Sequence, residues 1–376
     1  MTVSIVTTQN FGMDRYSQEI AQRSRGPVFS VDRYNSSPGQ MWEVVDALKE
    51  FCQPVHYPNQ HFGWYAFSAG LPYIMTVHDL ERITMSFPRE NVDEQRKLRM
   101  DAAAIQKAHH VIAVSHATKR DIVRHLNVPK DRVSVVHNGV DHSVFHMREP
   151  IHQEFPFILY VGSERPRKNL RRLLAAFSQA KKDADIASLK LVKIGGPGRS
   201  LEFREDTLSA ITEFGLTGEV IFLENVDDDL LASYYASAKA LVYASLYEGF
   251  GFPLVEAMAT GCPVITSRYG AQSEISGNAG YLVDPLDTNE LSRAIVDVVS
   301  DGNLGRKLTL KGLKQSKKYC WNDAARETVK IFKLVEAKVE KENDIIKLCE
   351  EESSFARDHD SQILLETGLL ANSGRG

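Results

Sequence analysis

The sequence predicts an α/β protein made of two doubly wound parallel-sheet domains. Its 376 residues are more than a single compact core of the usual size accommodates. Short apolar runs alternate with longer amphipathic segments along the chain, which is the pattern of repeated strand–helix units. A polar stretch with two prolines, residues 147–156, separates two such series and indicates an interdomain linker.

Buried strands are expected where four to six apolar or β-branched residues stand together. In the first series these runs cover residues 3–7, 73–77, 111–115 and 133–137. In the second they cover residues 157–161, 189–194, 220–223, 240–244 and 263–266, with helices expected at 169–183 and 229–238. The sequence therefore predicts a first domain at residues 1–148 and a second at 149–340.

The end of the chain follows a different pattern. Residues 318–335, K-Y-C-W-N-D-A-A-R-E-T-V-K-I-F-K-L-V, are expected to form a helix capped by Asn322 or Asp323. Residues 342–376 contain eight acidic and three basic residues. Because such a charged composition is typical of disordered segments, we expect the helix to fray beyond Glu340 and residues 341–376 to form a mobile acidic tail.

Composition excludes several classes of partner. A formal net charge of -4 argues against nucleic acid. The first ten residues lack the basic and long apolar regions of a secretion signal, and no window approaches the ~20 apolar residues of a membrane span. We expect a cytoplasmic protein, with a peripheral contact at the inner face of the cell membrane left open. Four widely spaced cysteines without a C-x-x-C pair are expected to be free thiols: Cys52, Cys262, Cys320 and Cys349.

Two glycine-containing loops follow predicted strands, where doubly wound sheets bind ligands. Residues 9–20 open a helix, and Gly12 would let a backbone amide approach a phosphate or would simply form a tight turn. Residues 193–200, K-I-G-G-P-G-R-S, place Gly195 in a turn that either admits a ligand or only redirects the chain. The second loop lacks the full phosphate-loop and dinucleotide patterns.

A third loop, V-G-S-E-R-P-R-K-N (161–169), places three cations at the start of a predicted helix. Arg165, Arg167 and Lys168 would oppose the helix dipole, which disfavours positive charge at an amino terminus. The cluster therefore costs stability unless it binds an anion. A diphosphate ligand is the favoured interpretation, and three solvated side chains are the alternative.

A fourth loop, Y-E-G-F-G-F-P-L-V-E-A-M (247–258), contains two glutamates with seven residues between them. Pro253 suits the first turn of a helix, so Glu248 would lie in the loop and Glu256 one to two turns into the helix. A carboxylate accepts two hydroxyl groups at once, as a sugar diol requires, and amides at a helix start favour phosphate. The stretch therefore suits a ligand with both groups.

With these motifs in order, the chain resembles the family 4 retaining glycosyltransferases, whose GT-B fold consists of two facing Rossmann-like domains. The glutamates match the family's E-x7-E signature, and the likeness spans residues 3–340. Further matching motifs are G-M-D-R-Y (12–16), T-V-H-D-L (76–80), V-S-H-A-T-K-R-D (114–121), V-H-N-G-V-D (136–141), T-G-C-P-V-I-T-S (260–267) and A-G-Y-L-V-D-P (279–285).

The resemblance implies roles for single residues. Glu256 would bind the ribose hydroxyls and Glu248 the hydroxyls of the transferred sugar. Lys168 would contact the diphosphate and Gly12 would lie beneath it. His78 would lie near the donor sugar, although a loop hydrogen bond is the interpretation that its position alone favours. The backbone amides completing the phosphate site would be those of Phe250, Gly251 and Phe252.

Two positions depart from the family pattern. Many relatives carry an arginine directly after the glycine of V-G, where this chain has Ser163. Arg165 or Arg167 would supply the missing charge, and Arg167 is favoured. Asp14 replaces a glycine that is common in the first loop, which leaves the acceptor contacts open.

The remaining clusters have ordinary interpretations. The acids at 227–229 precede a helix and are expected to cap it. R-K-L-R (96–99) is expected to be a solvated helix face, with anionic lipid as the alternative partner. Three nearby histidines lack the spacing of a metal site and are expected to be surface or packed residues: His109, His110 and His116.

The resemblance implies transfer of a hexose, with mannose favoured, from a nucleoside diphosphate sugar to a glycan or glycolipid, with retention and without a metal or other cofactor. The third loop is similar to those of mannosyl- and rhamnosyl-type transferases of surface polysaccharide assembly. GDP-mannose is therefore the first expected donor and a UDP-hexose the second. The alternatives are a GT-B sugar-nucleotide epimerase or sugar phosphorylase, and a non-catalytic nucleotide-sugar-binding partner of another transferase.

Overall fold

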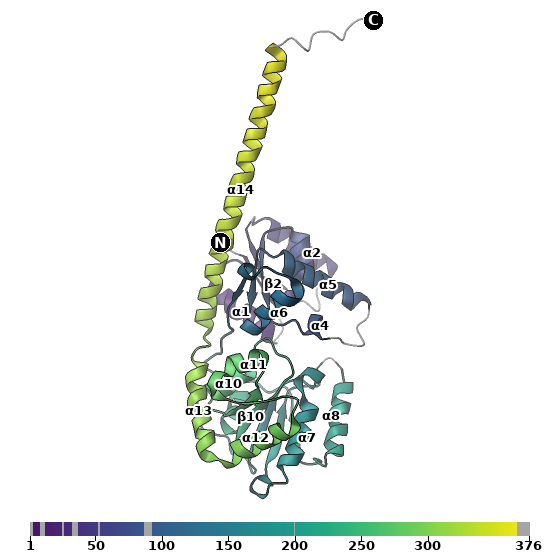
Figure 1. Cartoon of the computed structure of the whole chain (residues 1–376), viewed down its shortest axis with the longest axis vertical. Coiled ribbons are helices and arrows are strands. Elements are labelled where there is room, and N and C mark those ends of the chain that lie inside the picture. Colours follow the sequence, from purple (N-terminus) through teal and green to yellow (C-terminus); the bar gives the residue numbers. More distant parts are fainter. Residues whose placement is uncertain are drawn as a thin grey trace.

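The computed structural model describes residues 3–7, 12–24, 26–31, 37–51, 53–85, 92–198 and 200–366. Within them the chain forms two six-stranded parallel sheets, one in each of two α/β domains that face each other (Figure 1). The first sheet has the order β2-β1-β3-β4-β5-β6 and the second β12-β11-β10-β7-β8-β9. The predicted fold class is confirmed.

The strands of the first sheet are β1 (Val3–Thr7), β2 (Val28–Val31), β3 (Val55–Tyr57), β4 (Tyr73–Val77), β5 (His110–Ala113) and β6 (Val133–Val135). Those of the second are β7 (Phe157–Val161), β8 (Lys190–Ile194), β9 (Val220–Leu223), β10 (Ala240–Tyr243), β11 (Val264–Ser267) and β12 (Gly280–Val283). All nine predicted strands are present within one or two residues. β2, β3 and β12 were not predicted; β3 has only three residues, V-H-Y.

Helices connect the strands on both faces of each sheet, as parallel pairing requires. In the first domain these are α1 (Gly12–Ser24), α2 (Pro38–Lys49), α3 (Gly63–Ala69), α4 (Glu81–Thr84), α5 (Val92–Lys107) and α6 (His116–Leu126). In the second they are α7 (Leu170–Ala180), α8 (Glu202–Glu213), α9 (Asp228–Ser237), α10 (Phe252–Ala259), α11 (Gly270–Ser276), α12 (Thr288–Ser300) and α13 (Gly302–Ser316). The short 3-10 helix η3 (Pro166–Lys168) follows β7.

The last helix, α14 (Trp321–Glu366), returns from the second domain along the first and extends beyond it (Figure 1). Trp321 packs against Tyr16, with ring centroids 6.2 Å apart, and Phe332 packs against His56 at 5.1 Å. A Cβ atom on Gly139 would lie 2.3 Å from the Trp321 backbone nitrogen, so only glycine permits this close approach. The helix thereby ties the two domains together.

The expectation that the final helix frays beyond Glu340 is wrong for residues 341–366, which are helical. Glu and Leu are among the commoner residues of this stretch, and both favour the helical conformation. Residues 367–376 lie outside the described part of the chain. The proposed domain boundaries at 148 and 340 stay predictions.

Candidate functional site

Strand order places two of the four loops selected from the sequence at one point of the second sheet. The chain runs from β7 to β8 and β9 on one side, and β10 pairs with β7 on the other. Doubly wound sheets bind ligands beyond the strand ends at this reversal. The cationic turn follows β7 and the E-x7-E loop follows β10. The topology therefore brings the two stretches together.

The Glu248 carboxylate is buried between two cations from the turn after β7. Lys168 Nζ lies 2.6 Å from Oε1 of Glu248, and Arg167 Nη1 lies 2.8 Å from Oε2. Burial would raise the pKa of Glu248, but the charges of Lys168 and Arg167 lower it to about 2. The acid is therefore ionised, and the cations expected to bind an anion are already paired with a carboxylate.

The cationic turn is anchored to the second sheet by Asn169. This residue adopts a left-handed backbone conformation with φ of 60°, directly after η3. Its side-chain amide donates to the carbonyl oxygens of Ala244 at 3.0 Å and Pro285 at 2.7 Å. Lys168 Nζ also donates to the hydroxyl oxygen of Tyr243, at 2.8 Å. Both cations are therefore held in place before any ligand arrives.

Glu256 lies in α10, as predicted, and contacts a residue of the other domain. Arg15 of α1 donates to Glu256 Oε1 at 3.1 Å, and the Tyr235 hydroxyl donates to Oε2 at 3.0 Å. Burial raises the pKa of Glu256, opposed by the charge of Arg15 and the hydrogen bond from Tyr235. Sequence reasoning did not select Arg15 as a site residue, although it lies within the quoted G-M-D-R-Y motif.

Glu81, in the first turn of α4, is a second residue that sequence reasoning missed. It is buried, and its Oε2 lies 2.8 Å from Arg167 Nε and 3.2 Å from Arg165 Nη1. The two arginines thus join the second domain to an acid of the first. Arg167 contacts both Glu81 and Glu248, whereas Arg165 contacts Glu81. That Arg167 substitutes for the family arginine stays a prediction.

The E-G-F-G loop touches the first domain through its backbone. A Cβ atom on Gly249 would lie 1.6 Å from the His78 carbonyl oxygen, so no side chain fits there. The Thr118 hydroxyl donates to the Gly249 carbonyl oxygen at 3.2 Å. Gly251 has a φ of 105° and precedes the first residue of α10, Phe252, so the loop ends at a helix amino terminus. Such a terminus favours an anion.

The His78 side chain faces its own domain. Nε2 donates to the Pro58 carbonyl oxygen at 2.9 Å, and the ring packs edge-on against Tyr16, with centroids 4.9 Å apart. Burial lowers the pKa of His78 to about 4, which keeps the ring neutral near pH 7. This hydrogen bond is the loop contact expected from the position of His78 in the sequence. A direct role toward the donor sugar stays a prediction.

Two further glycines, Gly195 and Gly12, were predicted to let a ligand approach or to form turns. Gly195 has a φ of 114°, and a Cβ atom there would lie 2.8 Å from the Gly162 carbonyl oxygen. This close packing of the loops after β7 and β8 supports the interpretation as a turn. Gly12 is the first residue of α1, and residues 8–11 before it lie outside the described chain.

The acids at 227–229 cap α9 and also reach other segments. Asp227 accepts a hydrogen bond from the Leu230 backbone N–H at 2.8 Å, which confirms the predicted cap. Asp228 lies 2.5 Å from the guanidinium of Arg15, and Asp229 lies 3.5 Å from that of Arg148.

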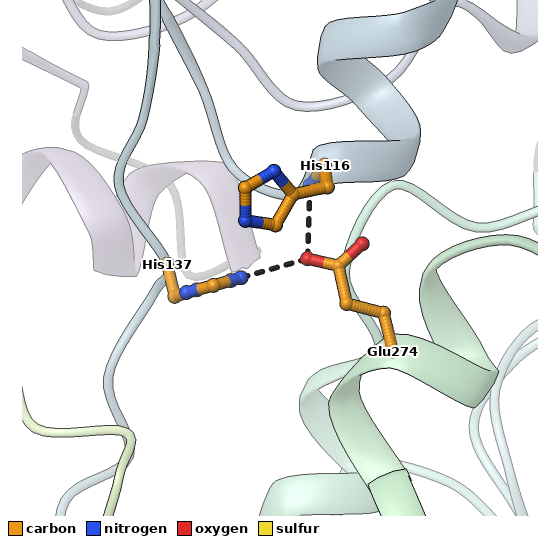
Figure 2. Close-up of side chains that lie close together, drawn as sticks. All are labelled: His116, His137 and Glu274. Atoms are coloured by element: carbon orange, nitrogen blue, oxygen red, sulfur yellow. Dashed lines mark hydrogen bonds and ion pairs between the residues drawn. The ribbon is translucent and has the colours of Figure 1, made fainter.

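The three histidines considered together in the sequence do not form one group. His110 bonds the Ser134 hydroxyl at 2.9 Å, and His109 Nδ1 accepts the Tyr73 N–H at 3.3 Å. The packed interpretation is confirmed for these two. His116 lies instead beside His137 and Glu274, which the sequence did not link to it (Figure 2).

Comparison with known proteins gives the same class for both domains. Residues 1–144 match the family model described as Glycosyltransferase Family 4, and residues 143–315 match that described as Glycosyl transferases group 1. The chain is 29% identical over 274 residues to an O-antigen chain mannosyltransferase B from Escherichia coli, with 70% of each chain covered.

Solved structures share the fold. Sucrose-phosphate synthase from Thermosynechococcus elongatus has a TM-score of 0.74 at 22% identity and covers 90% of this chain and 100% of its own. Anabaena Alr3699/HepE in complex with UDP-glucose has a TM-score of 0.71 at 19% identity and covers 88% of this chain and 99% of its own.

Two facing parallel-sheet domains with a charged site between them form a GT-B fold, and both family models that match describe glycosyltransferases. The chain belongs to the family 4 glycosyltransferases, so the predicted resemblance is confirmed. Among the described residues, no helix combines the length and apolarity needed to cross a membrane.

Proposed function

We propose that this glycosyltransferase transfers a hexose, retaining the anomeric configuration, from a nucleoside diphosphate sugar to a hydroxyl group of a glycan or glycolipid. The observation that carries the proposal is the buried cluster of Glu248, Arg167 and Lys168 where β7 and β10 end. It combines a carboxylate able to accept sugar hydroxyls with two cations able to meet a diphosphate.

The two ends of the donor would bind to different acids. Glu256, within α10, would accept the ribose hydroxyls. Glu248, in the loop before α10, would accept those of the hexose. The amide groups of residues 250–252 would face the phosphate oxygens. Since Arg15 occupies Glu256 Oε1, its guanidinium would have to turn away or share the carboxylate when the ribose enters.

The chemical step would depend on stabilising the leaving group. As the bond between the anomeric carbon and the phosphate oxygen breaks, negative charge develops on the diphosphate, and Lys168 and Arg167 would stabilise it. The acceptor oxygen would bond to the anomeric carbon on the same face, and the departing phosphate would accept its proton. Domain closure would exclude water and so prevent hydrolysis of the donor.

GDP-mannose is the first proposed donor and a UDP-hexose the second. The E. coli relative named as a mannosyltransferase supports the first, at 29% identity. The Arg165, Gly195, Gly12 and His78 positions would complete donor binding. The acceptor would be a glycan or lipid-linked saccharide, which would place the enzyme in the cytoplasm with a weak contact at the inner membrane face.

A thermal-shift screen against nucleotide sugars tests the donor, and NMR of the anomeric proton of the product tests retention. We expect stabilisation by GDP-mannose, a product with the donor's anomeric configuration, and unchanged turnover in EDTA. Inversion would contradict the retaining mechanism, and a loss of turnover in EDTA that Mg²⁺ restores would contradict the metal-free step. Conversion of donor without acceptor would indicate an epimerase, a need for inorganic phosphate would indicate a phosphorylase, and no turnover would indicate a binding partner.

A further inference from the structure

A cluster of three metal-ligating side chains lies where the two domains meet, beside the E-G-F-G loop, with the His137 ring centroid 6.5 Å from that of Phe250. His116 begins α6 and His137 follows β6 in the first domain, whereas Glu274 belongs to α11 of the second. One nitrogen or oxygen of each lies within 4.8 Å of the others. Figure 2 shows both imidazole rings beside the Glu274 carboxylate.

Two of the three side chains are already oriented. Glu274 accepts the backbone N–H groups of His116 at 2.9 Å and Ala117 at 3.1 Å, and its Oε1 lies 2.7 Å from His137 Nε2. The His137 ring packs against Tyr319, with centroids 5.7 Å apart and an interplanar angle of 85°. Partners of this kind orient the ligands of metal sites and strengthen binding.

The third side chain, His116, is exposed and would complete the group. Its ring centroid lies 5.8 Å from that of His137. Two imidazoles and one carboxylate are a donor set that zinc accepts, with the fourth position left for water. Ligand atoms around tetrahedral zinc stand about 3.4 Å apart, given bond lengths near 2.1 Å. The exposed ring would therefore have to rotate inward, and His137 Nε2 and Glu274 Oε1, now 2.7 Å apart, would have to separate slightly as the ion replaces the proton between them.

Neighbouring cations do not block the position. A groove opens beside the cluster and is lined by His116, His137, Lys119 and Lys330 among others. Lys119 donates to the Val133 carbonyl oxygen, and Lys330 lies 2.7 Å from the Glu327 carboxylate. The groove therefore gives an ion a path from solvent, with both lysines turned to other partners.

We propose that His116, His137 and Glu274 form a binding site for a divalent transition-metal ion, represented by Zn²⁺, that clamps the two domains together. The ion would not take part in sugar transfer, since none of its three ligands is among the residues proposed to contact the donor. Because the ligands come from both domains, bound ion would favour the interdomain arrangement seen here.

His116→Ala is the sharp test, because Glu274 contacts the backbone of His116 and this contact survives the substitution. We expect Zn²⁺ to raise the Tm of the native chain, and Co²⁺ to give the visible absorption of a low-coordinate site. His116→Ala should weaken Zn²⁺ binding, measured by calorimetry, at least about tenfold, with its metal-free Tm unchanged. His125→Ala is the matched control, since His125 is exposed near the other end of α6.

Equal Zn²⁺ affinity in the native chain and His116→Ala, or no measurable binding to either, would overturn the site. Hydrogen exchange tests the clamp separately: the amides of His116 and Ala117 should exchange more slowly in Zn²⁺ in the native chain and not in His116→Ala. Binding without this slowing would overturn the clamp. None of these readouts depends on the proposed sugar transfer.

Discussion

Arg15 of the first domain and Glu256 of the second lie 3.1 Å apart, guanidinium to carboxylate, across the domain interface. The same guanidinium lies 2.5 Å from Asp228. Arg15 thus neutralises a buried acid that the proposed donor would need. The contact links the arrangement of the domains to the state of the binding site.

Arg15→Ala should lower the free energy of unfolding, because Glu256 would then be buried without its cation. We expect a loss of about 1–2 kcal/mol, since Arg15 itself is partly solvated. Urea denaturation measures the change. Arg23→Ala is the matched control on the same helix, with the half-buried Glu19 and the exposed Asn322 as partners, and should cost less than about 0.5 kcal/mol. Equal losses would show that the interdomain contact adds nothing.

Glu248→Gln should reduce turnover at least about 100-fold, because the neutral amide can neither orient sugar hydroxyls as the carboxylate does nor balance Lys168 and Arg167. Initial rates with a saturating nucleotide sugar measure the effect. Glu213→Gln removes an acid from an exposed pair with Arg171 and should leave the rate unchanged. A Glu248→Gln variant of native activity would remove this residue from the mechanism.

Lys168→Ala and Arg167→Ala should each lower turnover about 100-fold, because each cation would stabilise the leaving diphosphate. Arg165→Ala should have a smaller effect, since its guanidinium contacts Glu81 and not Glu248. Arg171→Ala is the exposed control. If neither Arg165→Ala nor Arg167→Ala weakens donor binding, both are wrongly assigned as substitutes for the family arginine.

Gly249→Ala should abolish turnover while each domain stays folded. A methyl group there would lie 1.6 Å from the His78 carbonyl oxygen, so the domains could not meet as they do here. Small-angle scattering should show a more open particle, and circular dichroism should be unchanged. Gly302→Ala meets nothing within 4 Å and serves as the control. A fully active Gly249→Ala enzyme would mean that this contact is not needed in catalysis.

The chain should lose stability as the pH falls from 7 to 5, because of buried neutral histidines. Burial lowers the pKa of His56 to about 3 and that of His78 to about 4. Below pH 6.5 the unfolded chain therefore binds protons that the folded chain does not, and the free energy of unfolding falls by roughly 2 kcal/mol per histidine by pH 5. His56→Gln should reduce this pH-dependent loss by the contribution of one histidine, measured by urea denaturation at each pH. An unchanged pH dependence in the variant would show that His56 is not responsible.

Much of the fold could be predicted because its strands are continuous apolar runs. β4, β7 and β9 have the predicted ends, since turn residues bound each run. β3 contains only V-H-Y and offers no such run, so it was missed. The length of α14 was underestimated because acidic composition was interpreted as disorder, although Glu and Lys also favour helix.

Only the part of the site that lies within sequence motifs of the second domain could be predicted. Glu248, Arg167 and Lys168 meet because adjacent strands carry their loops. Glu81 and Arg15 could not be assigned as partners of residues in the second domain, since pairing across the interface depends on how two separately folded domains face each other. For the same reason, the contact between His116 of the first domain and Glu274 of the second could not be predicted.

A crystal structure of the chain with GDP-mannose, or with a UDP-hexose if that is the ligand that stabilises it, tests the central claim most directly. The account predicts the ribose hydroxyls on Glu256, with Arg15 displaced, and the hexose hydroxyls on Glu248, with the diphosphate against Lys168 and Arg167. A donor bound elsewhere, with the Arg15–Glu256 and Lys168–Glu248 pairs both intact, would contradict it.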